Sequence, residues 1–295
     1  MMYIIPSDVE LIVARDLRDA IELLSKLEDA RVMAGGTDLV VDLKTGRLRP
    51  KHVIYIGRLS ELKYISDDGS SLRIGALTTI QEILDSKIVV ERAPLLKIVA
   101  EKFANWQIRN VATIGGNLCN ASPAADMAVP LLVYNSLIKA ESVNGSRLIP
   151  VREFFKGPRQ TALKRGEVVT EITVPYRDLE GCGYAYFKAG RRQGHDISLV
   201  AAACAVVIRD GVISDVRVAL NSVAPTPVRA VSVERALLGR KPSLEVIENA
   251  SKLVVQDISP ISDVRAPAEY RLYMARLLTR EALLEALRGV EGGVV

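Results

Sequence analysis

Two glycine pairs occur in contexts where a protein backbone can bind an anion. The first segment is Ala34-Gly35-Gly36-Thr37-Asp38 and the second is Thr113-Ile114-Gly115-Gly116-Asn117. Glycine lets the backbone approach a ligand closely, and successive N–H groups in a tight turn form a concave site for anionic oxygens. The chemistry that these segments predict is therefore binding of a phosphate or a pyrophosphate. For each segment taken alone, an ordinary turn is the alternative.

Other kinds of chemistry lack candidate side chains. Neither segment matches G-x-G-x-x-G or G-x-x-x-x-G-K-[ST], so a nicotinamide-type Rossmann loop and a P-loop are both unsupported. His52 and His195 cannot form a multi-histidine metal site, and no Ser or Cys lies in a nucleophile-elbow context. We interpret His195 as an exposed loop residue. The sequence thus predicts no catalytic side chain and no metal site, and the chemistry is expected from a bound cofactor.

The three cysteines point to the same conclusion. Cys119, Cys182 and Cys204 show no C-x-x-C spacing, which argues against disulfides, zinc ligation and iron–sulfur ligation. We expect Cys119 to be a small buried residue rather than a reactive thiol, because nothing cationic flanks it in sequence.

The composition limits the class of protein. The chain has 295 residues, of which 49% are hydrophobic and 25% charged, as in a globular protein of about two domains. A net charge of +4 and only 5% aromatic residues argue against a nucleic-acid partner. No stretch of about 18 apolar residues occurs, and Asp8 and Glu10 come too early for a signal peptide. We expect a soluble, cytoplasmic protein without a membrane span.

Hydrophobic periodicity predicts the elements that position the two glycine segments. Asp16 is a possible N-cap for a helix that ends near Leu27, and Asn144-Gly145 indicates a hairpin turn. The predicted strands are 31–34, 53–56, 72–74, 137–141 and 168–174. The predicted helices are 16–27, 37–43, 79–84, one that begins at Pro94, and 126–134.

The last third of the chain has its own pattern. We place the main boundary after Pro175, where glycines and charges interrupt the periodicity. Strands predicted over 184–189, 201–208 and 212–221 would form a three-stranded antiparallel sheet. Helices are predicted at about 231–237, 244–255 and 268–288. This part is predicted to be a separate α+β domain.

Four segments together resemble a known family. They are AGGTDL over residues 34–39, IRNVATIGGNL over 108–118, ASPAAD over 121–126 and KAGRRQGHDI over 188–197. This combination is similar to the FAD-binding (medium) subunits of the molybdenum hydroxylases, which include xanthine dehydrogenase, aldehyde oxidoreductases and aerobic carbon monoxide dehydrogenase. The resemblance covers nearly the whole chain.

The resemblance implies an α+β fold in two parts. A vanillyl-alcohol-oxidase-type FAD-binding domain would span residues 1–177, with lobes of about 1–57 and 58–177. A C-terminal flavoprotein domain would span 178–295, and FAD would lie between the parts. Some relatives carry an extra four-iron cluster in a cysteine-rich loop, which the scattered cysteines here do not support.

The resemblance also implies a set of cofactor-binding residues. The first-lobe residues that would surround the pyrophosphate with backbone amides are Val32, Met33, Ala34, Gly35, Gly36, Thr37, Asp38 and Leu39. The second-lobe residues that would do the same are Thr113, Ile114, Gly115, Gly116 and Asn117.

Four further positions are implied, each with an ordinary alternative. Asp126 would bind sugar or ribityl hydroxyls, with Ser122 a weaker candidate, or Asp126 would cap the helix that follows. Phe103 would pack on the cofactor or belong to the core, and Val169 would take a matching apolar position or be ordinary strand core. Lys188 would be a cation near the flavin that favours its anionic reduced form, or a surface lysine at a strand end.

The implied function is electron transfer within a complex. A molybdenum subunit would oxidise the substrate, iron–sulfur clusters on a small subunit would relay electrons, and FAD on this chain would pass them to an external acceptor. The substrate stays open among purine, aldehyde, nicotinate-like heterocycle and carbon monoxide, with the 121–126 segment favouring the xanthine or aldehyde branch. NAD, ferredoxin, quinone and oxygen stay open as acceptors. The alternatives are a stand-alone FAD oxidase or reductase and a flavin-free interaction subunit.

Overall fold

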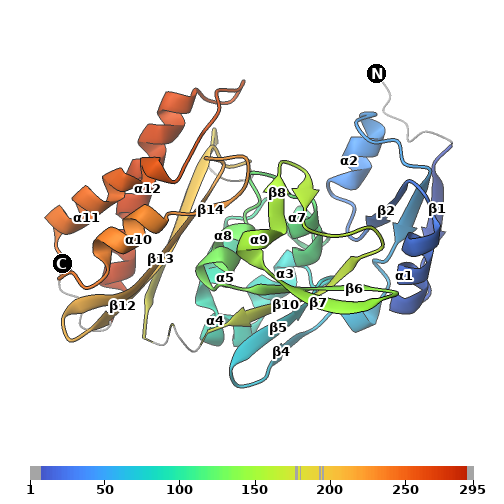
Figure 1. The fold of residues 1–295 in the computed structure, drawn as a ribbon, viewed down its shortest axis with the longest axis horizontal. Coiled ribbons are helices and arrows are strands. Elements are labelled where there is room, and N and C mark those ends of the chain that lie inside the picture. The colour runs from blue at the N-terminus through green and yellow to red at the C-terminus, as the bar shows by residue number, and fades with distance from the viewer. Residues whose placement is uncertain (1–7, 177–178, 180, 193, 195, 291–295) are drawn as a thin grey trace.

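The computed structural model describes residues 8–176, 179, 181–192, 194 and 196–290. Three larger sheets divide it into units that we call N-terminal, central and C-terminal, and these follow one another along the longest axis of the molecule (Figure 1). The predicted boundary at 177–178 and His195 lie outside the described residues. Within these residues, no helix is both long and apolar enough to cross a membrane.

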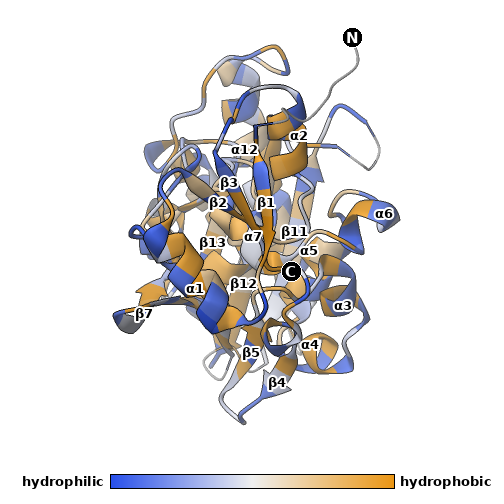
Figure 2. Ribbon diagram, turned by 90° about the vertical axis from the view of Figure 1, so that its right-hand side faces the viewer, coloured by the Kyte–Doolittle hydropathy of each residue, from blue (hydrophilic) through white to orange (hydrophobic). Residues whose placement is uncertain are grey.

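The N-terminal unit is a small parallel sheet with two helices. Its strands are β1 (Glu10–Val13), β2 (Ala30–Met33) and β3 (His52–Tyr55), in the order β1-β3-β2. Helix α1 (Leu17–Lys26) begins at the predicted cap, where Asp16 accepts a hydrogen bond from the Asp19 N–H. In Figure 2 hydrophobic and hydrophilic residues alternate along α1, as expected of a helix with one buried face. Helix α2 (Leu39–Lys44) follows β2 across the first glycine pair.

The central unit is a five-stranded antiparallel sheet covered by short helices. Its strand order is β4 (Ile65–Asp67), β5 (Ser71–Gly75), β10 (Val168–Pro175), β6 (Leu137–Ser142) and β7 (Gly145–Pro150). Its helices are α3 (Ile80–Asp85), α4 (Lys87–Arg92), α5 (Pro94–Glu101), α6 (Trp106–Arg109), α7 (Ile114–Cys119), α8 (Ala128–Val133) and α9 (Val151–Phe154). A hairpin of β8 (Phe155–Gly157) and β9 (Gln160–Thr161) and a 3-10 turn at Ser60–Leu62 complete it. One core joins this sheet to its helices and to Tyr186 and Ala203 of the next unit.

The C-terminal unit packs an antiparallel sheet against helices. Its strands are β11 (Gly183–Ala189), β12 (Val200–Arg209), β13 (Val212–Asn221) and β14 (Val228–Arg229), paired in that order. Its helices are α10 (Val231–Leu237), α11 (Leu244–Ser251) and α12 (Ala268–Arg288), with a 3-10 turn at Lys252–Gln256. The predicted sheet of three strands is wrong by one, because the two-residue strand β14 is too short to produce a visible alternation.

Four further sequence predictions need correction. The second glycine segment is the start of helix α7 and not a turn. The helix predicted over 126–134 begins at Ala128, and the one predicted over 244–255 ends as a 3-10 turn. Cys119 is exposed, because it faces a cavity and not the core. The fold class, α+β with two sheet-and-helix parts before a C-terminal α+β part, is confirmed.

Candidate functional site

A cavity of about 870 Å³ lies between the N-terminal and central units. This volume falls in the range of pockets that take small molecules and cofactors. Fourteen of the predicted residues line it, and they come from both units: Val32, Met33, Ala34, Gly35, Gly36, Thr37, Asp38, Leu39, Phe103, Thr113, Gly115, Gly116, Asn117 and Val169. Three predicted residues, Ile114, Asp126 and Lys188, do not line it.

The first glycine segment leaves a row of backbone donors in the cavity wall. Strand β2 ends at Met33, and Gly36 has a φ of +73°, a left-handed conformation that favours glycine. Within the described part of the chain, the N–H groups from Gly35 to Leu39 donate to no protein acceptor. They precede the N-terminus of α2, where the helix adds partial positive charge. This segment therefore has backbone donors whose hydrogen bonds an anion could accept.

Gly35 also brings the two units into direct backbone contact. A Cβ at this position would lie 1.9 Å from the carbonyl oxygen of Val111, which belongs to the segment between α6 and α7. No side chain fits there. The absence of a Cβ is what lets the first glycine segment and the second one line the same cavity.

The amides of the second glycine segment are already engaged within the protein. The N–H of Ile114 donates to Thr78 O (3.0 Å), and the N–H of Gly115 donates to Ala76 O (2.9 Å). The N–H of Gly116 donates to Oγ1 of Thr113 (3.1 Å), which is the N-cap of α7. With the Asn117 N–H, which donates to Thr113 O (3.0 Å), the protein already uses four of the five N–H groups of this segment, so few of them are left for a pyrophosphate.

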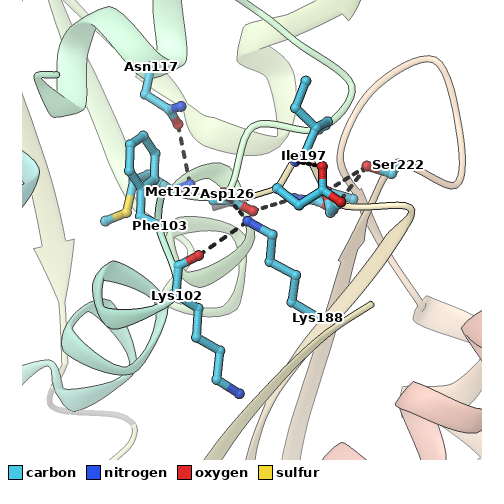
Figure 3. Close-up of polar contacts among 12 residues, drawn as sticks. Lys102, Phe103, Asn117, Asp126, Met127, Lys188, Ile197 and Ser222 are labelled. Atoms are coloured by element: carbon cyan, nitrogen blue, oxygen red, sulfur yellow. Dashed lines mark hydrogen bonds and ion pairs between the residues drawn. The ribbon is translucent and has the colours of Figure 1, made fainter. Parts of the chain in front are cut away.

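The second segment instead offers close approach and side-chain groups. A Cβ at Gly115 would lie 2.7 Å from Ala76 O, so this glycine packs on the central sheet. A Cβ at Gly116 would lie 2.8 Å from Thr113 Oγ1, so this glycine lets the Thr113 side chain cap α7. Thr113 keeps a hydroxyl hydrogen that can be donated, and Asn117 keeps its amide NH₂. The Asn117 Oδ1 is engaged, because it accepts from the Met127 N–H (3.3 Å; Figure 3).

Phe103 and Val169 are core residues that also reach the cavity. Each lines the cavity and each belongs to the core of the central unit. Phe103 follows α5, and Val169 lies where a bulge interrupts the pairing of β10 with β6. Bulges redirect side chains, which is how a strand-core residue comes to face the cavity.

Asp126 and Lys188 form a nearly buried ion pair next to the cavity. Their Oδ2 and Nζ atoms are 2.7 Å apart, and their side chains are 11% and 9% exposed. Lys188 Nζ also donates to the backbone oxygen of Lys102 (3.3 Å), the residue before Phe103 (Figure 3). Lys188 is thus not a surface lysine. Asp126 does not cap α8, whose N-cap is Met127, so both ordinary alternatives are wrong.

One hydroxyl group and one amide group also contact the Asp126 carboxylate. Its Oδ1 accepts from the Tyr186 hydroxyl (3.1 Å) and from Asn221 Nδ2 (3.5 Å). Burial raises the pKa of Tyr186 well above its usual value, and the adjacent Asp126 charge raises it further. Tyr186 therefore stays a neutral donor. Asp126, which precedes α8 in the central unit, is thus joined to β11 through Lys188 and Tyr186 and to β13 through Asn221.

Sequence reasoning missed a third strip of cavity residues. They are Arg159, Thr161, Leu163, Lys164, Arg165, Gly166, Glu167 and Val168, on the path from the β8–β9 hairpin into β10. The signal in the sequence is Lys164-Arg165-Gly166, where Gly166 has a φ of +82°. Such a basic turn before a strand is indistinguishable from a solvated loop until the tertiary structure brings it to the cavity.

Comparison with known proteins identifies the family. Residues 7–177 match the FAD binding domain in molybdopterin dehydrogenase, and residues 185–286 match the CO dehydrogenase flavoprotein C-terminal domain. The chain is a medium, FAD-binding subunit of the molybdenum hydroxylase family. It is an oxidoreductase subunit, and the cofactor of its family is FAD.

Relatives of this flavoprotein align over nearly its whole length. The xanthine dehydrogenase FAD-binding subunit of Escherichia coli O157:H7 is 36% identical over 281 residues, which cover 95% of this chain and 96% of that one. The carbon monoxide dehydrogenase medium chain of Hydrogenophaga pseudoflava is 35% identical over 282 residues, 95% and 97% of the two chains. The solved structure of Hydrogenophaga pseudoflava carbon monoxide dehydrogenase lacking the Mo-pyranopterin moiety superposes with a TM-score of 0.94 at 34% identity, covering 97% of this chain and all of that one.

The cavity of this flavoprotein fits a diphosphate-bearing cofactor. The five consecutive residues Gly35 to Leu39, whose N–H groups donate to no acceptor among the described residues, lie in its wall. Apolar side chains for a ring system are present at Phe103 and Val169. The backbone donors and the apolar side chains are therefore of the kinds that a cofactor with a diphosphate and a ring system needs.

One carboxyl group in this cavity opposes an anionic ligand. Burial raises the pKa of Asp38, the dominant cause, and the neighbouring Asp42 raises it further, whereas Arg159 and a hydrogen bond from Asn120 lower it. The folded protein thus takes up a proton on Asp38 more readily than the unfolded chain does. The stabilising contribution of protonated Asp38 is present at pH values below the pKa that Asp38 has in the unfolded chain. This contribution is lost as the pH rises through the pKa that Asp38 has in the folded protein.

Replacing Asp38 with asparagine is therefore expected to stabilise the protein slightly at neutral pH, because Asp38 is exposed and solvent screens most of its charge. The gain over the unaltered protein should grow as the pH rises through the folded pKa of Asp38 and shrink in acid. Urea unfolding of both proteins across an acid-to-neutral pH series measures it. A pH-independent difference would show that the desolvated charge is not the cause.

Proposed function

We propose that this subunit transfers electrons through FAD inside a heteromeric, cytoplasmic complex. It would receive them from iron–sulfur clusters on a small partner subunit, while a large subunit with the molybdenum cofactor oxidises the substrate. It would pass them to an external acceptor. The relatives support this assignment, since one is named as a xanthine dehydrogenase FAD-binding subunit and another as a carbon monoxide dehydrogenase medium chain.

The observation that carries the proposal is the row of unsatisfied N–H groups at Gly35 to Leu39 in a cavity shared by two units. These amides would bind the diphosphate, with the Thr113 hydroxyl and the Asn117 amide contributing from α7. Phe103 and Val169 would pack on the ring system and exclude water from it. FAD, when bound, supplies the redox chemistry itself.

Lys188 and Asp126 would act on the cofactor as a pair. A lone cation near a flavin would favour its anionic reduced form, but the Asp126 carboxylate 2.7 Å away offsets that charge. The effect of Lys188 on the flavin would then depend on the position in which Asp126 holds the lysine ammonium group. The Asp126 oxygens would also be available to cofactor hydroxyls, because a carboxylate accepts more than one hydrogen bond per oxygen.

The test is purification of the native protein with its partners. We expect a larger and a smaller polypeptide to co-purify with this chain, and the chain to hold FAD in a ratio of about one to one. A colourless protein that takes up no added FAD would refute cofactor binding. An isolated chain that binds FAD and oxidises a small substrate without partners would instead establish a stand-alone oxidase or reductase.

A further inference from the structure

The hairpin between β8 and β9 carries a cation to the cavity edge. Arg159 lies at its tip with a φ of +62°, a conformation that side-chain-bearing residues adopt only when neighbouring contacts hold it. Its N–H donates to Ala121 O (2.9 Å), and this bond anchors the tip beside the C-terminal end of α7. The hairpin of the central unit is thus fixed in position, and its arginine reaches outward from it.

The guanidinium of Arg159 spans the gap between two units. Its Nη1 donates to Asn120 Oδ1 at the end of α7 and lies 3.6 Å from Asp42 Oδ2 in α2. The Asp42 side chain is 9% exposed, and its other oxygen lies 3.5 Å from Arg47 Nη1. One nearly buried carboxylate thus holds two arginines, of which Arg47 belongs to its own unit and Arg159 to the other. All four residues line the cavity.

We propose that the Arg159–Asp42 ion pair is a clasp that slows the release of FAD; this rests on the proposed function. Asp42 lies in α2, which directly follows the donor row at Gly35 to Leu39. Opening the cavity between α2 and the hairpin requires the pair to separate. Arg47 pairs with the same carboxylate but connects nothing across the gap. Arg159 therefore retains the cofactor because it connects the two units, which Arg47, the other positive charge beside Asp42, does not.

The experiment measures the rate of FAD release from the full chain. Release after dilution is followed by the return of flavin fluorescence. Arg159→Gln is expected to speed release about three- to fivefold, as for the loss of one half-exposed ion pair. Arg47→Gln removes the arginine that does not cross the gap and should speed release less than Arg159→Gln does. Asp42→Asn should resemble Arg159→Gln, and the double variant should be no faster than either one, because both remove the same contact.

Further readouts separate a clasp from a merely structural arginine. The unfolding midpoints of the FAD-free Arg159→Gln and Arg47→Gln proteins should agree to within about 2 °C. Added salt should speed release from the unaltered protein more than from Arg159→Gln, because Arg159 is half exposed and its pair is screened. Arg159→Lys should restore part of the slow release.

Two results would overturn the clasp. One is Arg159→Gln releasing FAD at the unaltered rate, and the other is Arg47→Gln accelerating release equally. An unaltered protein that takes up no FAD would refute the proposed function, and this outcome is distinct from both.

Discussion

A Gly35→Ala variant is expected to lose FAD binding and a large part of its stability. The new Cβ would lie 1.9 Å from Val111 O and 2.8 Å from its carbonyl carbon, so backbone must move. The Val111 segment has little freedom, because Val111 N–H donates to Ile108 O and Ala112 O accepts from the Ile80 N–H. The N-terminal and central units would be pushed apart at the point where both glycine segments line the cavity.

The expected loss is about 3 kcal/mol in the free energy of unfolding, the upper range for overpacking. FAD affinity should fall by at least about 100-fold, because the donor row at 35–39 would no longer face the rest of the cavity. Urea unfolding and titration with FAD measure the two effects.

Gly157→Ala is the matched control for this substitution. Gly157 lies in the nearby β8–β9 hairpin, and a Cβ there would meet only the flexible end of Gln160, at 3.4 Å. We expect a change within about 0.5 kcal/mol and unaltered FAD affinity. If Gly35→Ala binds FAD as tightly as Gly157→Ala does, close approach at Gly35 is not what forms the cavity.

Lys188→Met is expected to destabilise the protein at least as much as Gly35→Ala does. It leaves the Asp126 carboxylate nearly buried, with only the Tyr186 hydroxyl and the Asn221 amide as partners. Removing one member of a buried ion pair costs about 3–5 kcal/mol, because the remaining charge is uncompensated. The contact between the central and C-terminal units should weaken, and FAD affinity should fall with it. Urea unfolding measures the first effect and FAD titration the second.

Two further variants test whether the charge is the cause. Adding Asp126→Asn to Lys188→Met should recover part of the lost stability, because the orphaned charge is gone. Lys97→Met removes an exposed partner of Glu101, where the side chains are 36% and 49% exposed, and should cost at most about 0.5 kcal/mol. The interpretation of a buried pair fails if Lys188→Met costs no more than Lys97→Met.

Local pattern predicted most elements well. The alternation over 212–221 coincides with β13, and that over 168–174 is β10 without its final proline. Thr79 and Glu82 form a capping box at the start of α3, where a helix was predicted. These features depend on residues near one another in sequence, and side-chain spacing reports such neighbours directly. Strand β14 was not predicted, because a strand of two residues is too short to show alternating hydrophobicity.

The predictions of site residues likewise succeeded where the contacts are local in sequence and failed where the partners are distant. The first glycine segment was predicted as a backbone anion site and has the free donors for it. The second also contains a glycine pair, yet its Ile114 and Gly115 N–H groups donate to Thr78 and Ala76, which are distant in sequence. Asp126 and Lys188 are separated by 62 positions and were given independent roles, although they form one ion pair. Arg159 was not noticed, since its partner Asp42 belongs to another unit.

Taken by itself, the order of residues determined the family, its FAD cofactor and the α+β elements, because short motifs and periodicities are local properties of a chain. Only the tertiary structure decided which N–H groups are free, which charges are paired and that three distant strips line one cavity. A donor or a charge that already has a partner in the protein is no longer available to a ligand. Residues that are distant in sequence but close in the fold therefore determine which groups of the site can still bind one.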